Sequence, residues 1–287
     1  REAGSGEDRY YHLVLLAENN QGYANLMKIV SKGFTEGFYY KPRVDMDVLK
    51  KYSKGIIALS ACLAGEVQRN IARGMYSEGK AAALRYQEVF GEGNFFLELQ
   101  DHGIPAQRTV NQGLMRMSQE LQIPLVATND CHYVRREDSK FHDILLCIQM
   151  GKTVDDPDRM RFNSDDYYLK SPAEMAALFP EYPEAITNTA KIAARCQVDF
   201  EFGHIQLPFY PIPAPYADDE AYLRALCEEA LPKRYAETTK AVRERLEYEL
   251  GVIHHMGYDS YFLIVWDFIN HYREVGISVG PGRGSAA

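Results

Sequence analysis

The stretches "FFLELQDHG" (95–103) and "PLVATNDCHY" (124–133) decide the fold, because each is a short apolar run followed directly by polar residues. Runs of this length between turn signals are typical of buried strands. Between them, "PAQRTVNQGLMRMSQELQ" (105–122) begins with a proline and spaces Leu114, Met117 and Leu121 as a helix does. This order predicts strands at 95–100 and 124–129 that are parallel and joined by a crossover helix.

The same alternation is found earlier and later in the chain. Apolar runs at 10–17 and 55–61 predict two more strands of this parallel set, and Asn19 or Asn20 is suited to cap the helix after the first run. Residues 136–149 predict another helix, with Phe141, Leu145 and Ile148 on one face. We therefore expect an α/β fold, the later part of a barrel whose remaining strands would precede Arg1.

A proline-rich stretch separates this region from a second one. Residues 202–219, "FGHIQLPFYPIPAPYADD", read as a linker or an extended crossing segment, and we place a domain boundary near residue 200. Beyond it, the sequence predicts helices, one of which carries an apolar stripe of Val242, Leu246, Leu250 and Ile253. A short strand at 277–279 is expected just before a glycine-rich loop.

Composition narrows the classes of protein. The 287 residues carry a net charge of −8, which argues mildly against nucleic-acid binding, although residues 233–245 are locally basic. Five cysteines, an odd number with no C-x-x-C pair, argue against a disulfide framework or a zinc ribbon and favour reduced thiols. The longest apolar run, "YFLIVW", is too short to cross a bilayer.

Polar residues after two predicted strands suggest a metal site. His102 follows the strand at 95–100, and Asp130 and His132 follow the strand at 124–129. Functional groups collect at the carboxyl ends of barrel strands, and imidazole with carboxylate suits Zn²⁺ or Mn²⁺. His12 is a fourth candidate, although it lies early in its predicted strand. The alternative is that these residues are polar loop residues in ordinary hydrogen bonds.

The loop "GPGRGS" (280–285), between a predicted strand and a helix start, is an anion-binding arrangement. Backbone N–H groups around Gly282 and Gly284 converge, Arg283 suits bidentate phosphate binding, and Ser285 adds a hydroxyl donor. The loop lacks the Lys-Ser/Thr of a Walker A motif. The alternative is a tight turn with a solvated arginine.

Five motifs together resemble the C-family replicative DNA polymerases of bacteria, the family of the DNA polymerase III alpha subunits. They are "GFYYKPRVD", "LSACLAGEV", "VATNDCHYV", "MGYDSYFLIVWDFI" and "GPGRGSAA". The resemblance implies that residues 1–200 are the later portion of a polymerase-and-histidinol-phosphatase domain, a distorted (β/α) barrel with a metal cluster. Residues 201–287 would begin a mixed α/β palm domain that is cut within the phosphate loop.

The resemblance also implies roles for particular residues. His12, His102, Asp130 and His132 fall where the family places metal ligands, and the loop from Gly282 to Ser285 would hold the triphosphate of the incoming nucleotide. The catalytic aspartates are expected beyond Ala287, so this piece alone is expected to lack polymerase activity.

The function implied by the resemblance is template-directed addition of deoxynucleotides to a primer 3′ end in the cytoplasm, with Mg²⁺ as cofactor and no membrane association. Primer–template DNA, deoxynucleoside triphosphates, a sliding clamp, a clamp loader and a proofreading exonuclease subunit are the implied partners. Two alternatives remain open for the barrel. One is a metal-dependent phosphoesterase or 3′–5′ exonuclease, and the other is a scaffold without catalysis that docks a separate exonuclease.

Overall fold

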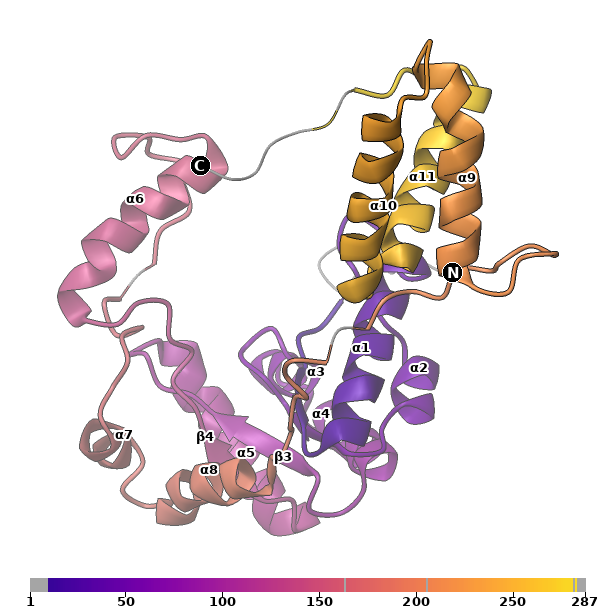
Figure 1. Ribbon diagram of the computed structural model, residues 1–287. Coiled ribbons are helices and arrows are strands. Elements are labelled where there is room, and N and C mark those ends of the chain that lie inside the picture. Colours follow the sequence, from indigo (N-terminus) through magenta and orange to yellow (C-terminus); the bar gives the residue numbers. More distant parts are fainter. Residues whose placement is uncertain (1–9, 163, 205, 281, 283–287) are drawn as a thin grey trace. The chain divides into compact units, whose positions relative to one another are not determined.

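The computed structural model describes residues 10–162, 164–204, 206–280 and 282, which Figure 1 shows as ribbon. The chain divides into two compact units, Arg1–Phe200 and Glu201–Ala287, called here the first and the second unit. The elements of the first unit are β1 (Val14–Ala17), α1 (Asn20–Thr35), α2 (Met46–Lys51), β2 (Ile56–Leu59), α3 (Glu66–Ala72), α4 (Tyr76–Phe90), β3 (Phe95–Leu99), α5 (Pro105–Leu121), β4 (Leu125–Ala127), the 3₁₀ turn η1 (Arg136–Asp138), α6 (Ser139–Met150), α7 (Pro172–Leu178) and α8 (Pro183–Arg195).

The described part of the first unit contains one four-stranded sheet in the order β1-β2-β3-β4. β2 pairs with β3, and β3 with β4, both in parallel, with Leu97 beside Leu125 in the register. Helix α5 crosses from β3 to β4 and packs on β3. The prediction of parallel strands joined by a crossover helix is confirmed for these three strands.

The prediction that the first strand is also parallel is wrong. β1 pairs with β2 in the antiparallel sense, with Val14 opposite Leu59 and Ala17 opposite Ile56. An apolar run shows that a strand is buried but not which way it runs, and an antiparallel edge strand on a parallel sheet is common. As a consequence, the amino end of β1 lies beside the carboxyl end of β2.

Both faces of the sheet are covered, which is why its strands are apolar except at Glu98 of β3. On one face, Ile56, Phe95, Leu97 and Leu125 pack in a core with side chains of α1, α3, α4 and α5, Leu114 among them. On the other face, a smaller cluster joins Ile57, Leu59, Phe96 and Val126 to Ile192 of α8. Strands buried on both sides read as continuous apolar runs rather than alternating ones.

The helix cap predicted from the sequence is observed, but the predicted apolar face of α6 is not the buried one. Asn19 caps α1 as predicted, since its side chain accepts a hydrogen bond from the Gly22 N–H at 3.0 Å. The stripe of Phe141, Leu145 and Ile148 lies on α6 as predicted, yet these side chains are 55%, 62% and 71% exposed. α6 therefore buries a different face of the helix.

The second unit is built from α9 (Asp219–Arg234), α10 (Lys240–His255) and α11 (Asp259–Glu274). Leu223, Leu250 and Leu263, one from each helix, form its core. Residues 277–279 have no strand structure, because no partner strand pairs with them in the described part of the chain. No helix among the described residues is long and apolar enough to cross a membrane.

Candidate functional site

The reversed direction of β1 brings His12 to the sheet edge where β2, β3 and β4 end. The His12 backbone N–H donates to the Ala64 carbonyl at 3.0 Å, and its ring Nδ1 lies 3.5 Å from the Cys62 Sγ. Cys62 comes three residues after β2. Burial raises the pKa of the Cys62 thiol, and the charge of Asp130 adds to the rise.

Asp130 and His132 follow β4 at the same edge. The Asp130 Oδ1 and His132 Nε2 atoms are 3.5 Å apart, and the side chains are 43% and 37% exposed. Asp130 has φ of +32°, in a region that non-glycine residues rarely adopt. Backbone strain of this kind is concentrated at functional sites, so the conformation agrees with the prediction that Asp130 has a functional role.

His102 is at the same edge but differs in its surroundings, because its side chain is only 1% exposed. The Gln107 Nε2 atom lies 3.0 Å from its Nδ1, and the Asn129 carbonyl oxygen lies 3.0 Å from its Nε2. An amide nitrogen only donates and a carbonyl only accepts, which assigns the proton to Nε2. Both ring nitrogens of His102 are therefore used in hydrogen bonds within the protein.

Tyr167 connects the two histidines. Its ring stacks on His102 with centroids 4.3 Å apart at an angle of 6°, and meets the His132 ring edge to face at 5.5 Å. The Tyr167 carbonyl accepts a hydrogen bond from the His132 N–H at 2.8 Å. The Tyr167 ring therefore contacts both histidines.

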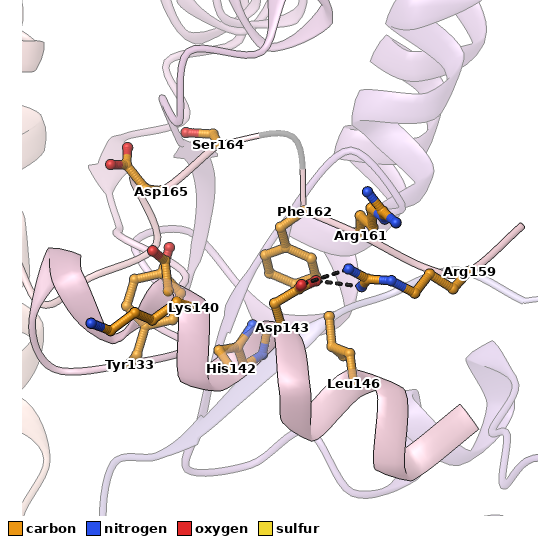
Figure 2. Close-up of a pocket in the computed structure, with 11 residues that line it drawn as sticks. Tyr133, Lys140, His142, Asp143, Leu146, Arg159, Arg161, Phe162, Ser164 and Asp165 are labelled. Carbon is orange, nitrogen blue, oxygen red and sulfur yellow. Dashed lines mark hydrogen bonds and ion pairs between the residues drawn. The ribbon is translucent and has the colours of Figure 1, made fainter. Parts of the chain in front are cut away.

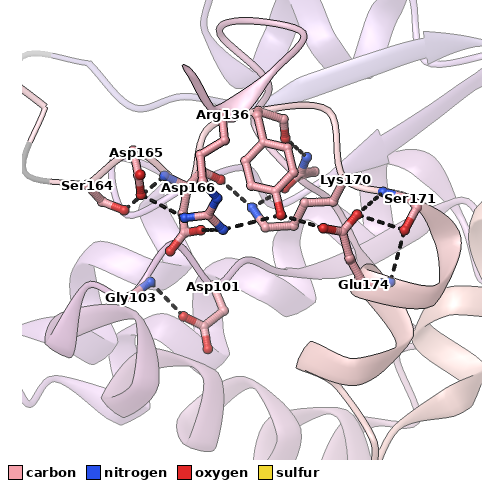
Figure 3. A network of polar contacts seen from close by, with 11 residues as sticks. Asp101, Gly103, Arg136, Ser164, Asp165, Asp166, Lys170, Ser171 and Glu174 are labelled. Atoms are coloured by element: carbon pink, nitrogen blue, oxygen red, sulfur yellow. Dashed lines mark hydrogen bonds and ion pairs between the residues drawn. The ribbon is translucent and has the colours of Figure 1, made fainter. Parts of the chain in front are cut away.

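A polar network holds the segment that carries Tyr167 (Figure 3). Arg136 bonds to Asp165 at 2.8 Å and to Asp166 at 2.7 Å. Lys170, which is 9% exposed, reaches the Asn129 Oδ1 at 3.1 Å and the Asp166 carbonyl, and burial lowers the pKa of its ammonium group. The network therefore holds the side chain of Asn129, the residue just before Asp130.

A buried carboxylate lies beneath the edge. Glu98, on β3, is 4% exposed and accepts hydrogen bonds from the Ala61 N–H at 2.9 Å and the Thr128 Oγ1 at 2.5 Å. Burial raises the pKa of the Glu98 carboxyl. Ala61 has φ of +66°, so Glu98 holds a strained turn that leads directly to Cys62.

These residues do not complete a metal site in the described part of the chain. No group of three or more His, Cys, Asp or Glu side chains there is arranged to hold one ion. The structure brings His12, Asp130 and His132 to one edge, and it engages both nitrogens of His102. Metal binding by the four residues stays a prediction, and we derive no chemical step through a metal.

A cavity of about 400 Å³ lies beside α6 (Figure 2), and two of its lining residues contact His132. The start of α6 and the segment around Phe162 line it, and the rings of His142 and Phe162 lie 5.4 Å and 4.8 Å from the His132 ring. This cavity is outside the set of residues that sequence motifs singled out.

Of the predicted phosphate loop (280–285), the structure describes Gly280 and Gly282, while Pro281 lies outside the described residues. Gly282 is therefore the one described residue among the four predicted to bind phosphate. Its φ is +112°, which glycine adopts without strain. Arg283, Gly284 and Ser285 lie outside the described residues. The prediction of triphosphate binding is therefore untouched by the structure.

Three residues of this edge escaped sequence reasoning: Cys62, Glu98 and Tyr167. Glu98 carried a usable signal, because a lone charged residue in an otherwise apolar buried strand needs a special partner. Cys62 follows the second predicted strand just as Asp130 follows the fourth. Tyr167 is 35 residues from its partner His132, in a polar stretch with no pattern to mark it.

Comparison with known proteins identifies the kind of chain. A PHP domain model matches residues 2–102, and a model of the bacterial DNA polymerase III alpha NTPase domain matches residues 221–287. The DNA polymerase III subunit alpha of Treponema pallidum is 47% identical over 97% of this chain, and those of Mycobacterium tuberculosis and Thermus aquaticus are 43% and 38% identical over 99% and 100% of it.

The chain belongs to the family of bacterial DNA polymerase III alpha subunits. It spans 24–28% of the length of these relatives. The family resemblance read from the motifs is confirmed, and so is a PHP domain in the first unit.

Proposed function

We propose that this chain is part of the catalytic subunit of a DNA-directed DNA polymerase that extends a primer 3′ end on a template. The observation that carries the proposal is the 47% identity over 97% of the chain to a protein named DNA polymerase III subunit alpha. The family model at 221–287 supports it, because that match reaches the Gly-rich loop.

We propose the domain roles along the same lines. Residues 1–200 would be the later portion of a distorted barrel of the PHP type, and residues 201–287 the start of the palm. The division of the chain after Phe200 and the mixed α/β sheet of the first unit are compatible with this assignment. Primer–template DNA and deoxynucleoside triphosphates would be the substrates, with a sliding clamp, a clamp loader and an exonuclease subunit as partners in the cytoplasm.

In this proposal, Gly282, Arg283, Gly284 and Ser285 bind the triphosphate of the incoming nucleotide. Mg²⁺ would stabilise the charge that develops during phosphoryl transfer. The guanidinium of Arg283 would make paired, charge-assisted hydrogen bonds to phosphate oxygens, which no other side chain of the loop can replace.

The test is Arg283→Ala in the full-length protein. Hydrogen bonds to charged groups contribute about 1.5–3 kcal/mol, so kcat/KM for the nucleotide should fall roughly ten- to a hundredfold. Primer–template affinity should change much less, because its contacts are spread over many phosphates. Arg273→Ala, an exposed arginine at the end of α11, is the matched control and should behave as wild type. Unchanged nucleotide kinetics in Arg283→Ala would contradict the assignment.

A second candidate function is metal-dependent phosphoester hydrolysis by the first unit. The observation that favours it is the gathering of His12, Asp130 and His132 at one edge of the sheet. These residues, and His102 as first predicted, would bind Zn²⁺ or Mn²⁺ together with donors supplied from elsewhere. The geometry distinguishes His102 from the others, because neither of its ring nitrogens has a free lone pair.

Metal content of the full-length protein separates these roles. Asp130→Ala and His132→Ala should lose bound Zn²⁺ or Mn²⁺, and His204→Ala, an exposed histidine of the second unit, should retain it. His102→Gln should also retain metal if its role is structural. If wild-type protein with metal hydrolyses no DNA ends yet still binds an exonuclease subunit, the first unit is a scaffold.

A further inference from the structure

A groove between α9 and α10 in the second unit has the size of a binding site. Its volume of about 440 Å³ lies within the range of about 300 to 1,000 Å³ that ligand pockets occupy. Residues 227–235, at the end of α9, and residues 241–249, at the start of α10, line it. We call it the α9–α10 groove. The sites proposed above use none of its residues.

The floor of the groove is apolar. Leu231 is only 8% exposed, and Val242 is half-buried. Cys227 and Leu246 line the groove and also pack against the leucine core of the second unit. An apolar side chain that enters the groove would therefore extend this core and leave water, which is the main driving force of association.

The exposed residues of the lining are those typical of protein interfaces. Tyr235 is 49% exposed, and Arg234 and Arg245 are exposed as well. Among the described residues, the lining contains these three side chains but no lysine. Tyrosine and arginine are enriched in interfaces and dominate their binding energy, whereas lysine is depleted. The composition therefore favours a protein partner.

The charge of the groove indicates which kind of protein. The Arg245 Nε atom pairs with the Glu249 Oε1 atom at 2.6 Å, so this arginine is already neutralised within the lining. Arg234 forms no ion pair among the residues that the structure describes. It belongs to the basic segment 233–245, which carries five lysines and arginines against two glutamates in a chain of net charge −8. An acidic partner is therefore attracted to this segment and repelled by most of the remaining surface.

The same features argue against nucleic acid as the occupant. Affinity for a nucleic-acid backbone comes from cations that neutralise several phosphates. Arg234 is the one lining cation without an ion pair in the described part of the chain, and the apolar floor offers nothing to a phosphate. A carboxylate close to an aliphatic side chain matches both the cation and the floor.

We propose that the α9–α10 groove docks an acidic amphipathic helix of a partner protein. An aliphatic side chain of that helix lies on Leu231, Val242 and Leu246, as in other grooves that bind a helix by its apolar face. A carboxylate three or four residues away is on the same side of the partner helix and makes paired hydrogen bonds with the Arg234 guanidinium. Tyr235 covers the contact. The inference goes beyond the polymerase assignment and does not depend on it.

The experiment measures binding of fluorescent peptides to the full-length protein by fluorescence anisotropy. The probe is a peptide of leucine, alanine and glutamate, about 20 residues long so that it forms a helix alone, with its leucines on one face and glutamates beside them. One counterpart has the same composition in shuffled order, and another has lysine in place of glutamate. The acidic amphipathic peptide should bind at least about tenfold more tightly than either counterpart, as expected for one charge-assisted pair.

Three variants of the lining test the contacts. Arg234→Ala should weaken binding of the acidic peptide about ten- to a hundredfold. Tyr235→Ala should weaken it about tenfold or more, as truncation of an interface tyrosine often does. Ala241→Phe, at an exposed position of the lining, places a ring in the groove and should block binding. Because this last change removes no core side chain, the proposal stays testable if Tyr235→Ala fails to fold.

Matched variants outside the lining serve as controls. Arg243→Ala removes an exposed arginine of the same basic segment, and Tyr272→Ala removes a tyrosine of α11 that is 47% exposed, close to the value for Tyr235. Both variants should bind the acidic peptide nearly as wild type does.

Equal binding of the acidic peptide and its shuffled counterpart would overturn the proposal. Equal weakening by Arg234→Ala and Arg243→Ala would do the same, because it would reduce the effect to diffuse charge. If another part of the full-length protein covers the groove, the acidic peptide stays unbound, and docking of a partner is refuted. Single-stranded DNA that binds wild type more tightly than Ala241→Phe would make the groove a nucleic-acid surface instead.

Discussion

Replacing Glu98 is the sharpest test of how the sheet edge is supported. Glu98→Ala removes the acceptor that the described structure gives to the Ala61 N–H and to the Thr128 hydroxyl, both in the buried layer below the edge. Each buried donor left without a partner costs about 1–3 kcal/mol, so the variant should lose about 2–6 kcal/mol of stability. That is a large share of the roughly 5–15 kcal/mol that stabilises a typical domain.

Glu98→Gln is the matched control. Its amide keeps one carbonyl oxygen, which can accept from the Ala61 N–H or from the Thr128 hydroxyl but not from both, because these donors use different oxygens of Glu98. With one buried donor left unpaired, the variant should lose about 1–3 kcal/mol at pH 7, roughly half the loss of Glu98→Ala. The difference between the two variants isolates the lost hydrogen bonds from the lost charge.

The pH dependence of stability gives an independent readout. An unfolded glutamate loses its proton near pH 4.3, whereas burial raises the pKa of folded Glu98. Between the two pKa values the folded state binds more protons, so the free energy of unfolding falls as pH rises. Above the folded pKa it stays at the lower level. Glu98→Gln should lack this part of the slope.

Amide hydrogen exchange measured by mass spectrometry on peptides from β2 and β3 reports both effects, once intrinsic rates are corrected for pH. Peptides from α10 serve as an internal control, because that helix belongs to the second unit. Equal protection of β3 in Glu98→Ala and Glu98→Gln would refute the reasoning. A wild-type pH slope in Glu98→Gln would refute the raised pKa.

The second unit gives two further predictions, both read from urea unfolding followed by the fluorescence of its single tryptophan, Trp266. The hydrogen bond to Asp259 raises the pKa of His254, so the stabilising contribution of protonated His254 is complete below about pH 6.5 and is lost as pH rises through the folded pKa. His254→Gln should therefore flatten the dependence of the free energy of unfolding on pH. An unchanged pH dependence in this variant would argue against the role of His254. Gly251 lies inside α10 with open space around an added Cβ, so Gly251→Ala should stabilise the second unit by about 0.5–1 kcal/mol. Gly257 has φ of +71°, so Gly257→Ala should destabilise the unit. A change in the free energy of unfolding of the same sign for both variants would contradict this reasoning.

The parallel core of the sheet was accessible from sequence because local patterns determine it. Apolar runs at 95–100 and 124–129 with a helix between them leave one common arrangement, and β3, α5 and β4 adopt it. The cap at Asn19 was accessible for the same reason, since its hydrogen bond to Gly22 spans only three residues.

What the sequence did not disclose depends on contacts between distant segments. The stripe of Phe141, Leu145 and Ile148 predicts an amphipathic helix correctly, but which face of α6 is buried depends on what the fold places beside it. The cavity beside His132 requires Arg159 to reach Asp143 across 16 residues, and neither residue belongs to a motif.

In the candidate site, too, the sequence predicts which residues lie there but not which of their atoms are free to bind an ion. Residue type and position after a strand place His102 and Asp130 at one edge, and they lie there. Whether a histidine can bind an ion depends on a free lone pair, and in this structure the Gln107 amide donates to the lone pair of Nδ1 while Nε2 donates its proton to the Asn129 carbonyl. The place of His102 among the metal ligands stays a prediction; the alternative that this geometry supports is that His102 positions the backbone at Asn129, just before Asp130, where φ is +32°. A positioning role of this kind predicts that His102→Gln disturbs Asp130 without removing a ligand.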